Sequence, residues 1–269
     1  MDSGAEQIRF QQQEKPHFNQ ALVPLQTFIP KADELKDGWG ITDLYSTGCP
    51  ELDDYLGGGY GRRNGGYEIV LIFGNPGQGK SALGLNMMLD PIAKGVNVGL
   101  MILEDDPADV VNRLRLMTGG TIDSRHNVFF LAEQTEGYTL PQALNAIEQW
   151  FKACDVVLLD HLEYLWAGAM GQSERDKFTQ QEIWMRRLNT LMKKTGKTIV
   201  MIQHTNKTKE EGMERIKGSS SLQQTATKVI EFNRNSEGCT MLRLWKTRFT
   251  PYRNKSLQVR LNNFLIEAV

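Results

Sequence analysis

The chain has 269 residues, of which 40% are hydrophobic and 23% are charged, and its formal net charge at pH 7 is −1. This length allows one large α/β domain with a well-buried core and leaves little room for a second independent domain. The net charge excludes nucleic-acid binding through bulk positive charge, and no apolar run approaches the roughly 18 residues of a membrane span.

Neither a targeting signal nor a cysteine framework is visible in the sequence. The first ten residues, MDSGAEQIRF, contain two acids and lack an apolar segment, which argues against signal and transit peptides. Cys49, Cys154 and Cys239 lie far apart without a CxxC pair, which indicates reduced thiols rather than a zinc knuckle or disulfides. We therefore expect a cytoplasmic protein without a membrane partner, or one of the host cytoplasm if a phage encodes it.

Residues 1–40 differ in composition from the rest of the chain. They are rich in Gln, contain Pro16, Pro24 and Pro30, and have only scattered apolar positions, which predicts an extended arm or linker. From Thr47 onward, short apolar segments alternate with amphipathic segments of helix length. The sequence therefore predicts an N-terminal arm at 1–40 and one α/β domain at 41–269.

The expected elements of this domain follow the order of a parallel sheet covered by helices. We expect strands at 67–73, 96–103, 128–131, 155–159 and 198–202, and helices at 80–94, 107–117, 140–151 and 178–194. Four further strands, at 228–233, 239–246, 256–262 and 264–267, follow one another with only turns between them. The predicted fold is a mostly parallel sheet flanked by helices, with an antiparallel C-terminal edge.

The segment that follows the first of these strands matches the phosphate-binding motif GxxxxGK[ST] in full. It consists of Gly74, Asn75, Pro76, Gly77, Gln78, Gly79, Lys80 and Ser81, between the apolar strand EIVLIF and a helix. Backbone N–H groups are expected to surround the phosphates of ATP or another NTP, with Lys80 at the β- and γ-phosphates and Ser81 on Mg²⁺. A chance Gly-rich turn is the alternative, but strand, loop and helix all favour a nucleotide site.

Carboxylates at two other strand ends are candidates for metal binding and hydrolysis. Asp160 ends the strand VVLLD and is the expected Walker B ligand of Mg²⁺, with helix capping as the alternative. Glu104 ends the strand GLMILE and is the candidate base for the attacking water. Asp105 and Asp106 follow directly, and either could be the base or could cap the helix that begins near Pro107. The sequence favours Glu104 and leaves this choice open.

Together these motifs resemble the RecA/DnaB-like hexameric replicative helicases, and most of all the helicase half of phage primase-helicases and of the mitochondrial helicase Twinkle. The resemblance extends from about Thr47 to Thr250. It rests on TGCPELDDYLGGG, the P-loop, the ILE that ends in Glu104, LLDHLEYL around Asp160, VMIQH, KGSSSLQQTAT and WKTRFT. It implies a RecA-like core, ATP hydrolysis with Mg²⁺, a role in DNA replication, and 5′–3′ translocation on single-stranded DNA.

The resemblance also implies roles for two pairs of residues. Gln203 and His204 end a strand beside Asp160, where the family senses the γ-phosphate; a strand-capping histidine is the alternative. Lys246 and Arg248 lie two apart in WKTRFT, so on one strand both would share a face. In the family such a pair reaches the ATP of the neighbouring subunit, whereas a solvated basic edge strand is the alternative.

Two loops, 168–177 and 206–220, are expected to face a central pore. The second contains the candidate DNA contacts Lys207, Lys209, Arg215, Lys217, Gly218 and Ser219, which suit a single-strand backbone. Three acids, Glu210, Glu211 and Glu214, dilute this charge, and a mobile solvated loop is the alternative. The family often has RGSG here, whereas this chain has KGSS.

The leading hypothesis is therefore a ring-shaped, hexameric helicase that acts on single-stranded DNA, with a primase, polymerase or loader as further partners. No primase module is present in the sequence, so priming would be the task of another protein. A RecA-type recombinase or annealing ATPase is the first alternative, because it shares the core and forms filaments instead. A KaiC-like regulatory ATPase, which needs no DNA, is the second.

Overall fold

The computed structural model describes residues 43–63, 66–123, 126–130, 140–162, 174–205, 220–234, 239–248, 250–251 and 254–269. The expected arm at 1–40 and both expected pore loops, apart from residues 174–177 and 220, lie outside these residues. The division of the chain into arm and domain therefore stays a prediction.

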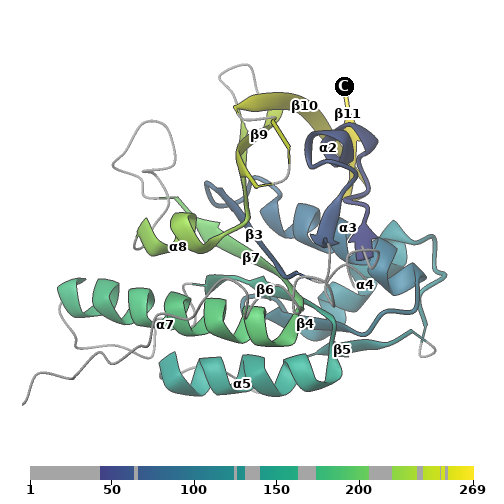
Figure 1. Ribbon diagram of the computed structural model, residues 1–269. Helices are drawn as coiled ribbons and strands as arrows, with labels where there is room; N and C mark the ends of the chain where they lie inside the picture. The colour runs from purple at the N-terminus through teal and green to yellow at the C-terminus, as the bar shows by residue number, and fades with distance from the viewer. Residues whose placement is uncertain are drawn as a thin grey trace, which may run out of the picture. The chain divides into compact units, whose positions relative to one another are not determined.

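Within the described residues, the centre of the domain is a nine-stranded sheet with the order β11-β10-β9-β8-β3-β7-β6-β4-β5 (Figure 1). Its strands are β3 (Glu68–Gly74), β4 (Val98–Ile102), β5 (Val128–Phe130), β6 (Val156–Asp160), β7 (Thr198–His204), β8 (Lys228–Arg234), β9 (Thr240–Thr247), β10 (Lys255–Asn262) and β11 (Leu265–Ala268). The larger helices are α3 (Lys80–Ala93), α4 (Pro107–Met117), α5 (Leu140–Ala153) and α7 (Glu174–Thr195). All the expected strands and helices are present, with ends that differ by a few residues.

The sheet changes from parallel to antiparallel pairing at β8. This strand is parallel to β3 on one side and antiparallel to β9 on the other, and β9, β10 and β11 continue the antiparallel edge. Strand β8 can run parallel because the chain between β7 and β8 is long enough for a crossover and contains α8 (Ser220–Thr225). The predicted antiparallel edge is thus confirmed, and its first strand also belongs to the parallel part.

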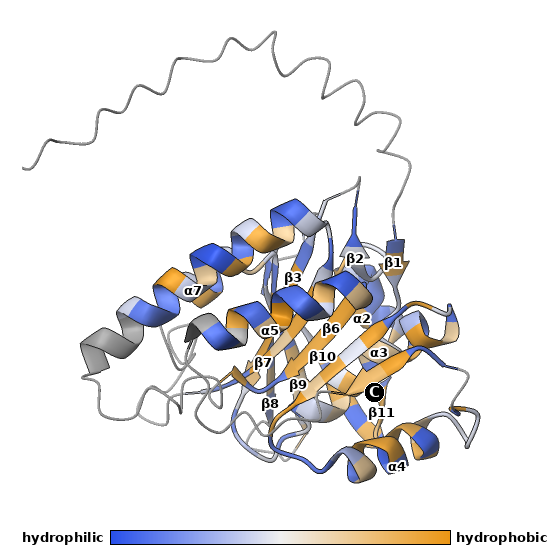
Figure 2. Ribbon diagram, turned by 90° about the horizontal axis from the view of Figure 1, so that it is seen from below, coloured by the Kyte–Doolittle hydropathy of each residue, from blue (hydrophilic) through white to orange (hydrophobic). Residues whose placement is uncertain are grey.

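Alternation of side chains along β3 builds a core on each face of the sheet. Ile69, Leu71 and Phe73 pack with the cluster that includes residues of α5 and α7, whereas Val70 and Ile72 pack with the cluster that includes α3 and α4. All five side chains are fully buried, and each contributes about 1.5–3 kcal/mol of hydrophobic free energy. Figure 2 shows α5 and α7 side by side over the same face of the strands. None of the described helices combines the length and apolar character that crossing a membrane requires.

A buried ion pair lies at the opposite end of β3 from the P-loop. The Lys228 ammonium contacts the Glu68 carboxylate, and both side chains are fully inaccessible to solvent. The Thr227 hydroxyl donates a second hydrogen bond to Glu68. Burial raises the pKa of Glu68 and lowers that of Lys228, so each group depends on the other to remain charged. This pair joins β3 to β8 beneath the candidate site.

Four short elements were not expected from the sequence: α2 (Pro50–Tyr55), α8, and the two-stranded sheet of β1 (Asp43–Tyr45) and β2 (Tyr60–Arg62). The Asp53 carboxylate accepts hydrogen bonds of 2.5 Å from the Ser46 hydroxyl and 2.7 Å from the Thr47 backbone N–H. These bonds fold the segment before α2 back on the helix. Such elements of three to six residues are too short to show a hydrophobic period.

Candidate nucleotide-binding and hydrolytic site

Parallel strands bring the predicted site residues to one edge of the sheet. Strands β3, β7, β6 and β4 are adjacent and parallel, so their carboxyl ends meet there. Gly74 and His204 end their strands in register with each other, and Asp160 ends β6. Glu104 follows shortly after the end of β4. The start of the P-loop, the acids Glu104 and Asp160 and the proposed sensor His204 therefore all lie at this edge.

The P-loop connects β3 to α3 and depends on glycine at two positions. A Cβ atom at Gly74 would lie 2.0 Å from the backbone oxygen of Phe232 on β8, so only glycine fits. Gly79 is the N-cap of α3 and has a φ of 103°, a left-handed conformation that favours glycine. The loop therefore ends at the N-terminus of a 14-residue helix, where backbone N–H groups attract anions.

The side chain of Lys80 is held against its own loop. It is 4% exposed, and its Nζ atom donates a 2.7 Å hydrogen bond to the backbone oxygen of Asn75. The side chain of Asn75 in turn accepts a hydrogen bond from the Thr205 hydroxyl, directly after β7. The ammonium group is thus positioned over the loop that would surround the phosphates.

Asp160 and Ser81 form the oxygen-donor pair that the sequence predicts for Mg²⁺. The Ser81 hydroxyl hydrogen-bonds to the Asp160 carboxylate, which is 3% exposed. Burial raises the pKa of Asp160 to about 6, although the bond from Ser81 and the charge of Lys80 act in the opposite direction. A hydroxyl and a carboxylate are hard oxygen ligands, so this pair fits Mg²⁺ bound together with nucleotide phosphates. A bound cation would also stabilise the buried charge of Asp160.

The structure gives different partners to the three consecutive acids after β4. Asp106 is the N-cap of α4, and its side chain accepts a 2.7 Å hydrogen bond from the backbone N–H of Ala108. Asp105 pairs with Arg113 at 2.6 Å. Glu104 has a half-exposed carboxylate, and its Oε2 atom lies 3.3 Å from the Nδ1 atom of His161. Glu104 is therefore the acid of this group that combines solvent access with a position beside Asp160 and His161.

His161 is a site residue that the sequence reasoning missed. It follows Asp160 directly, is 3% exposed, and its ring lies 4.1 Å from that of His204 between centroids. The signal available was its place in LLDHLEYL, immediately after a buried strand at the carboxyl edge. Gln203, 1% exposed, is buried at the end of β7, and His204 is partly exposed.

Lys246 lies within β9, and Arg248 lies just beyond the end of that strand. Strand β9 ends at Thr247, so Arg248 lies one residue beyond the strand and is exposed. Lys246 donates hydrogen bonds of 2.8 and 2.9 Å to the backbone oxygens of Gln223 and Gln224 at the end of α8. The bulge in β9 lies at Trp245, before Lys246, and Lys246 and Thr247 pair regularly with β8. The expectation that both cations share one strand face stays a prediction.

The candidate DNA contacts Lys207, Lys209, Arg215, Lys217, Gly218 and Ser219 all lie outside the described residues. Their assignment stays a prediction.

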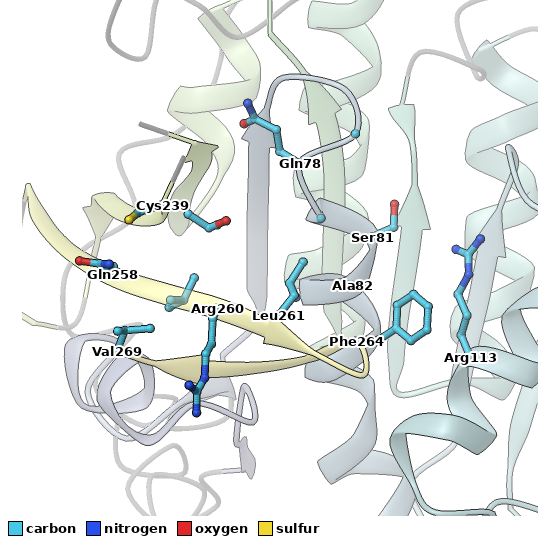
Figure 3. Close-up of a pocket in the computed structure, with 14 residues that line it drawn as sticks. Gln78, Ser81, Ala82, Arg113, Cys239, Gln258, Arg260, Leu261, Phe264 and Val269 are labelled. Carbon is cyan, nitrogen blue, oxygen red and sulfur yellow. The ribbon is translucent and has the colours of Figure 1, made fainter. Parts of the chain in front are cut away.

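A cavity of about 660 Å³ lies beside the P-loop, between the start of α3 and the β10–β11 hairpin (Figure 3). Gln78, Ser81 and Ala82 line it from the P-loop side, and Arg113 of α4 also lines it. The hairpin contributes Leu261 and Phe264, among other residues. The Oε1 atom of Gln78 is buried without a hydrogen-bond partner among the described residues, which costs about 1–3 kcal/mol. A ligand with a hydrogen-bond donor would satisfy this group.

One side chain of α3 fixes the hairpin that forms the far wall of the cavity. Asn86 donates a 2.5 Å hydrogen bond to the backbone oxygen of Phe264 and accepts one from the backbone N–H of Ile266. Asn263 and Phe264, the two turn residues, both have positive φ angles of 48° and 66°, as a type I′ hairpin requires. Phe264, predicted as the first residue of a strand, therefore belongs to the turn.

The sheet order, the P-loop after β3 and the acids at the same edge define a RecA-like P-loop ATPase domain. The AAA domain family matches residues 50–210, more than half of the chain, and the chain belongs to that family. A UPF0273 protein of Aeropyrum pernix is 36% identical over 70 residues, which are 26% of this chain and 27% of that protein. The chain thus aligns with about a quarter of the length of this curated relative.

Solved structures share the fold over most of the chain. The ATPase domain of G40P superposes with a TM-score of 0.68 at 16% identity, over 91% of this chain and 98% of that domain. The RadB recombinase gives 0.63 at 16% identity, over 84% and 100%. A KaiC-like protein of Pyrococcus horikoshii OT3 gives 0.61 at 17% identity, over 85% and 100%. At these identities the likeness establishes the RecA-like fold alone.

Proposed function

We propose that this chain is an ATP-driven replicative DNA helicase that assembles into a ring and translocates along single-stranded DNA. The proposal rests on the arrangement of Lys80, Ser81, Glu104 and Asp160 at one sheet edge, and on the exposed position of Arg248. The first feature supports ATP hydrolysis, and the second supports assembly.

Hydrolysis follows from what each of these side chains can do. With Mg²⁺–ATP bound, Lys80 and the N-terminus of α3 would stabilise negative charge on the phosphates, and Ser81 and Asp160 would hold the cation. Glu104 would orient and deprotonate the attacking water. The cavity between Gln78 and the β10–β11 hairpin would accept the ribose and base, because it begins where the P-loop ends.

The register of the sheet supports a role for Arg248 in a neighbouring subunit. Thr247 pairs with Lys228, which pairs with Val70, and Val70 precedes Gly74 by four residues along β3. At about 3.3 Å per residue, the end of β9 is therefore about 13 Å along the sheet from the start of its own P-loop. An exposed guanidinium at that distance favours contact with the nucleotide of a neighbouring subunit, and activity would then depend on assembly.

A recombinase that forms filaments is the alternative with a specific observation in its favour, since the RadB recombinase shares the fold over most of this chain. Both functions need ATP and single-stranded DNA, so binding assays alone do not separate them. Electron microscopy of the protein with ATP and single-stranded DNA separates closed rings from continuous filaments.

Strand separation on a forked DNA duplex tests the proposal. The wild-type protein is expected to release the labelled strand in the presence of Mg²⁺–ATP, and the Lys80→Ala variant is expected to release none. Lys94→Ala, which removes an exposed lysine at the end of the same helix, is the matched control and should unwind normally. ATP hydrolysis without strand release across assembly conditions, together with filaments, would favour the recombinase.

A further inference from the structure

A cluster of three metal-ligating side chains lies beside Ser81 and Asp160, the pair that fits Mg²⁺. The cluster includes neither of these two residues. The cluster consists of Glu104, His161 and His204, each of which offers one ligand atom, and these three atoms all lie within 4.8 Å of one another. The three residues come from three adjacent strand ends, those of β4, β6 and β7. We propose that they form a binding site for a transition-metal ion of the Zn²⁺ type.

The separation between the ligand atoms of His161 and Glu104 fits tetrahedral coordination. Zn²⁺ binds histidine nitrogen and carboxylate oxygen at about 2.0–2.2 Å, which places neighbouring ligand atoms of a tetrahedron roughly 3.3–3.6 Å apart. The observed separation between His161 Nδ1 and Glu104 Oε2 is 3.3 Å. The ligand atom of His204 lies within 4.8 Å of the other two, so binding of one ion by all three requires an approach of at most about 1.5 Å. Two histidines and one glutamate leave the fourth position open for water or a phosphate oxygen.

The chemistry of the donors separates this site from the Mg²⁺ site. Imidazole nitrogen suits Zn²⁺ and similar ions, whereas Mg²⁺ prefers oxygen ligands in octahedral geometry. Ser81 and Asp160 offer oxygen, and the cluster offers two imidazoles. His161 Nδ1 lies 4.0 Å from Asp160 Oδ1, so the two sites are adjacent but share no ligand. A Zn²⁺ ion in the cluster would therefore leave the Mg²⁺ ligands in place.

Occupation of the cluster would stop hydrolysis. The ion would take the carboxylate of Glu104, which the proposed function assigns as the base for the attacking water. Only this consequence rests on the proposed function; metal binding itself does not. The transition-metal site would then be an inhibitory site that blocks turnover while ATP remains bound.

Metal binding is tested first, without nucleotide. The EDTA-stripped protein is titrated with Co²⁺ in a buffer without Mg²⁺, and the visible absorption of tetrahedral Co²⁺ is recorded; Zn²⁺ is then added to displace it. We expect one ion for each chain. His204→Ala and Glu104→Gln should each weaken binding more than about tenfold, since loss of an outer-shell partner already costs roughly 10- to 100-fold.

His126→Ala is the matched control, because His126 also lies beside a carboxylate, with Nδ1 3.4 Å from Asp123 Oδ1, but belongs to no described cluster of three ligands. This variant should bind Co²⁺ like the wild type. Equal affinity in His204→Ala, Glu104→Gln and the wild type would overturn the proposal, as would loss of binding in His126→Ala alone. Both test variants change exposed or partly exposed residues, so unfolding is not expected to obscure the result.

Inhibition is tested second, with Mg²⁺–ATP in excess. Added Zn²⁺ should abolish hydrolysis by the wild type and by His126→Ala at similar concentrations, while binding of a fluorescent ATP analogue persists. If Co²⁺ and Zn²⁺ bind but hydrolysis is unaffected, the metal site stands and the assignment of Glu104 as base fails. If neither ion binds while the protein hydrolyses ATP, the metal site fails and the assignment of ATP hydrolysis to this site stands.

Discussion

The Nδ1 atom of His161 lies 3.3 Å from the Oε2 atom of Glu104, across the gap between the ends of β6 and β4. Strands β4 and β6 are paired in parallel up to Ile102 and Asp160, so this contact is a direct consequence of their register. It holds one end of the Glu104 carboxylate beside Asp160. The neighbouring acids Asp105 and Asp106 are engaged with α4 instead.

Replacing Glu104 should therefore affect hydrolysis far more than replacing its neighbours. Glu104→Gln keeps the size of the side chain but removes the base, so ATP should bind normally and turnover should fall by about 10²- to 10⁴-fold. Asp106→Asn is the control, because asparagine is an equally good N-cap. Single-turnover hydrolysis and nucleotide-binding measurements check both variants. Normal turnover in Glu104→Gln would show that another group activates the water.

The buried carboxylate of Asp160 predicts a pH-dependent change in stability. Its pKa is raised from the ordinary value of 3.8 to about 6, so the folded protein binds a proton more tightly than the unfolded chain. Ionised Asp160 therefore destabilises the fold by an amount that grows between about pH 4 and pH 6 and reaches at most about 3 kcal/mol above that range. Asp160→Asn removes this penalty while keeping the side-chain shape.

We accordingly expect Asp160→Asn to raise the thermal midpoint of the metal-free, nucleotide-free protein at about pH 8. The difference from the wild type should shrink as the pH falls through about 6 toward 4, because the wild-type group becomes neutral there. Thermal unfolding in EDTA across this range measures the difference. A difference that stays constant across the whole range would contradict the assigned pKa.

Arg248 and Lys246 should give opposite results when each is replaced by alanine. Arg248 is exposed, so Arg248→Ala should change the free energy of unfolding by less than about 0.5 kcal/mol but should hydrolyse ATP about 10³- to 10⁵-fold more slowly. Mixing this variant into wild-type protein should depress activity if the arginine acts on a neighbouring subunit. An unchanged rate in Arg248→Ala would remove the assignment.

Lys246→Ala should be destabilised instead. Its ammonium group donates to two backbone oxygens at the end of α8, and each hydrogen bond from a charged group contributes about 1.5–3 kcal/mol at most. We expect chemical denaturation to show a measurably lower free energy of unfolding. Amide hydrogen exchange should show faster exchange in α8. A variant as stable as the wild type would mean that the two contacts contribute nothing in solution.

The buried Glu68–Lys228 pair predicts a large effect on stability and none on the chemistry. Lys228→Met leaves an unpaired buried carboxylate, which costs about 3–5 kcal/mol. The double variant Glu68→Gln, Lys228→Met should recover part of this loss, because the remaining amide carries no charge. Urea denaturation of the single and double variants measures the difference. Additive losses in the double variant would show that the two charges do not interact.

The sequence predicted the larger elements and the phosphate-binding loop because both have strong local signals. The apolar run EIVLIF marks a buried strand, and the glycines and Lys80 follow directly. The role of His161 could not be read in the same way, since its contact with Glu104 joins distant positions in the chain through the pairing of β4 and β6. The Glu68–Lys228 pair was missed because charged residues are expected at the surface.

A tertiary contact also changed one local prediction. Phe264 has an apolar side chain that suits a strand, yet the hydrogen bonds of Asn86 hold it in the turn of the β10–β11 hairpin. A neighbouring element, α3, thus decides the geometry of this turn.

The rate of ATP hydrolysis with and without single-stranded DNA tests the central claim most directly. We predict that single-stranded DNA stimulates hydrolysis by the wild type and that the stimulation weakens as salt increases, because phosphate contacts release counterions. Lys80→Ala should show no hydrolysis under either condition. An identical wild-type rate with and without DNA, at low salt and under conditions of assembly, would contradict a motor that works on DNA.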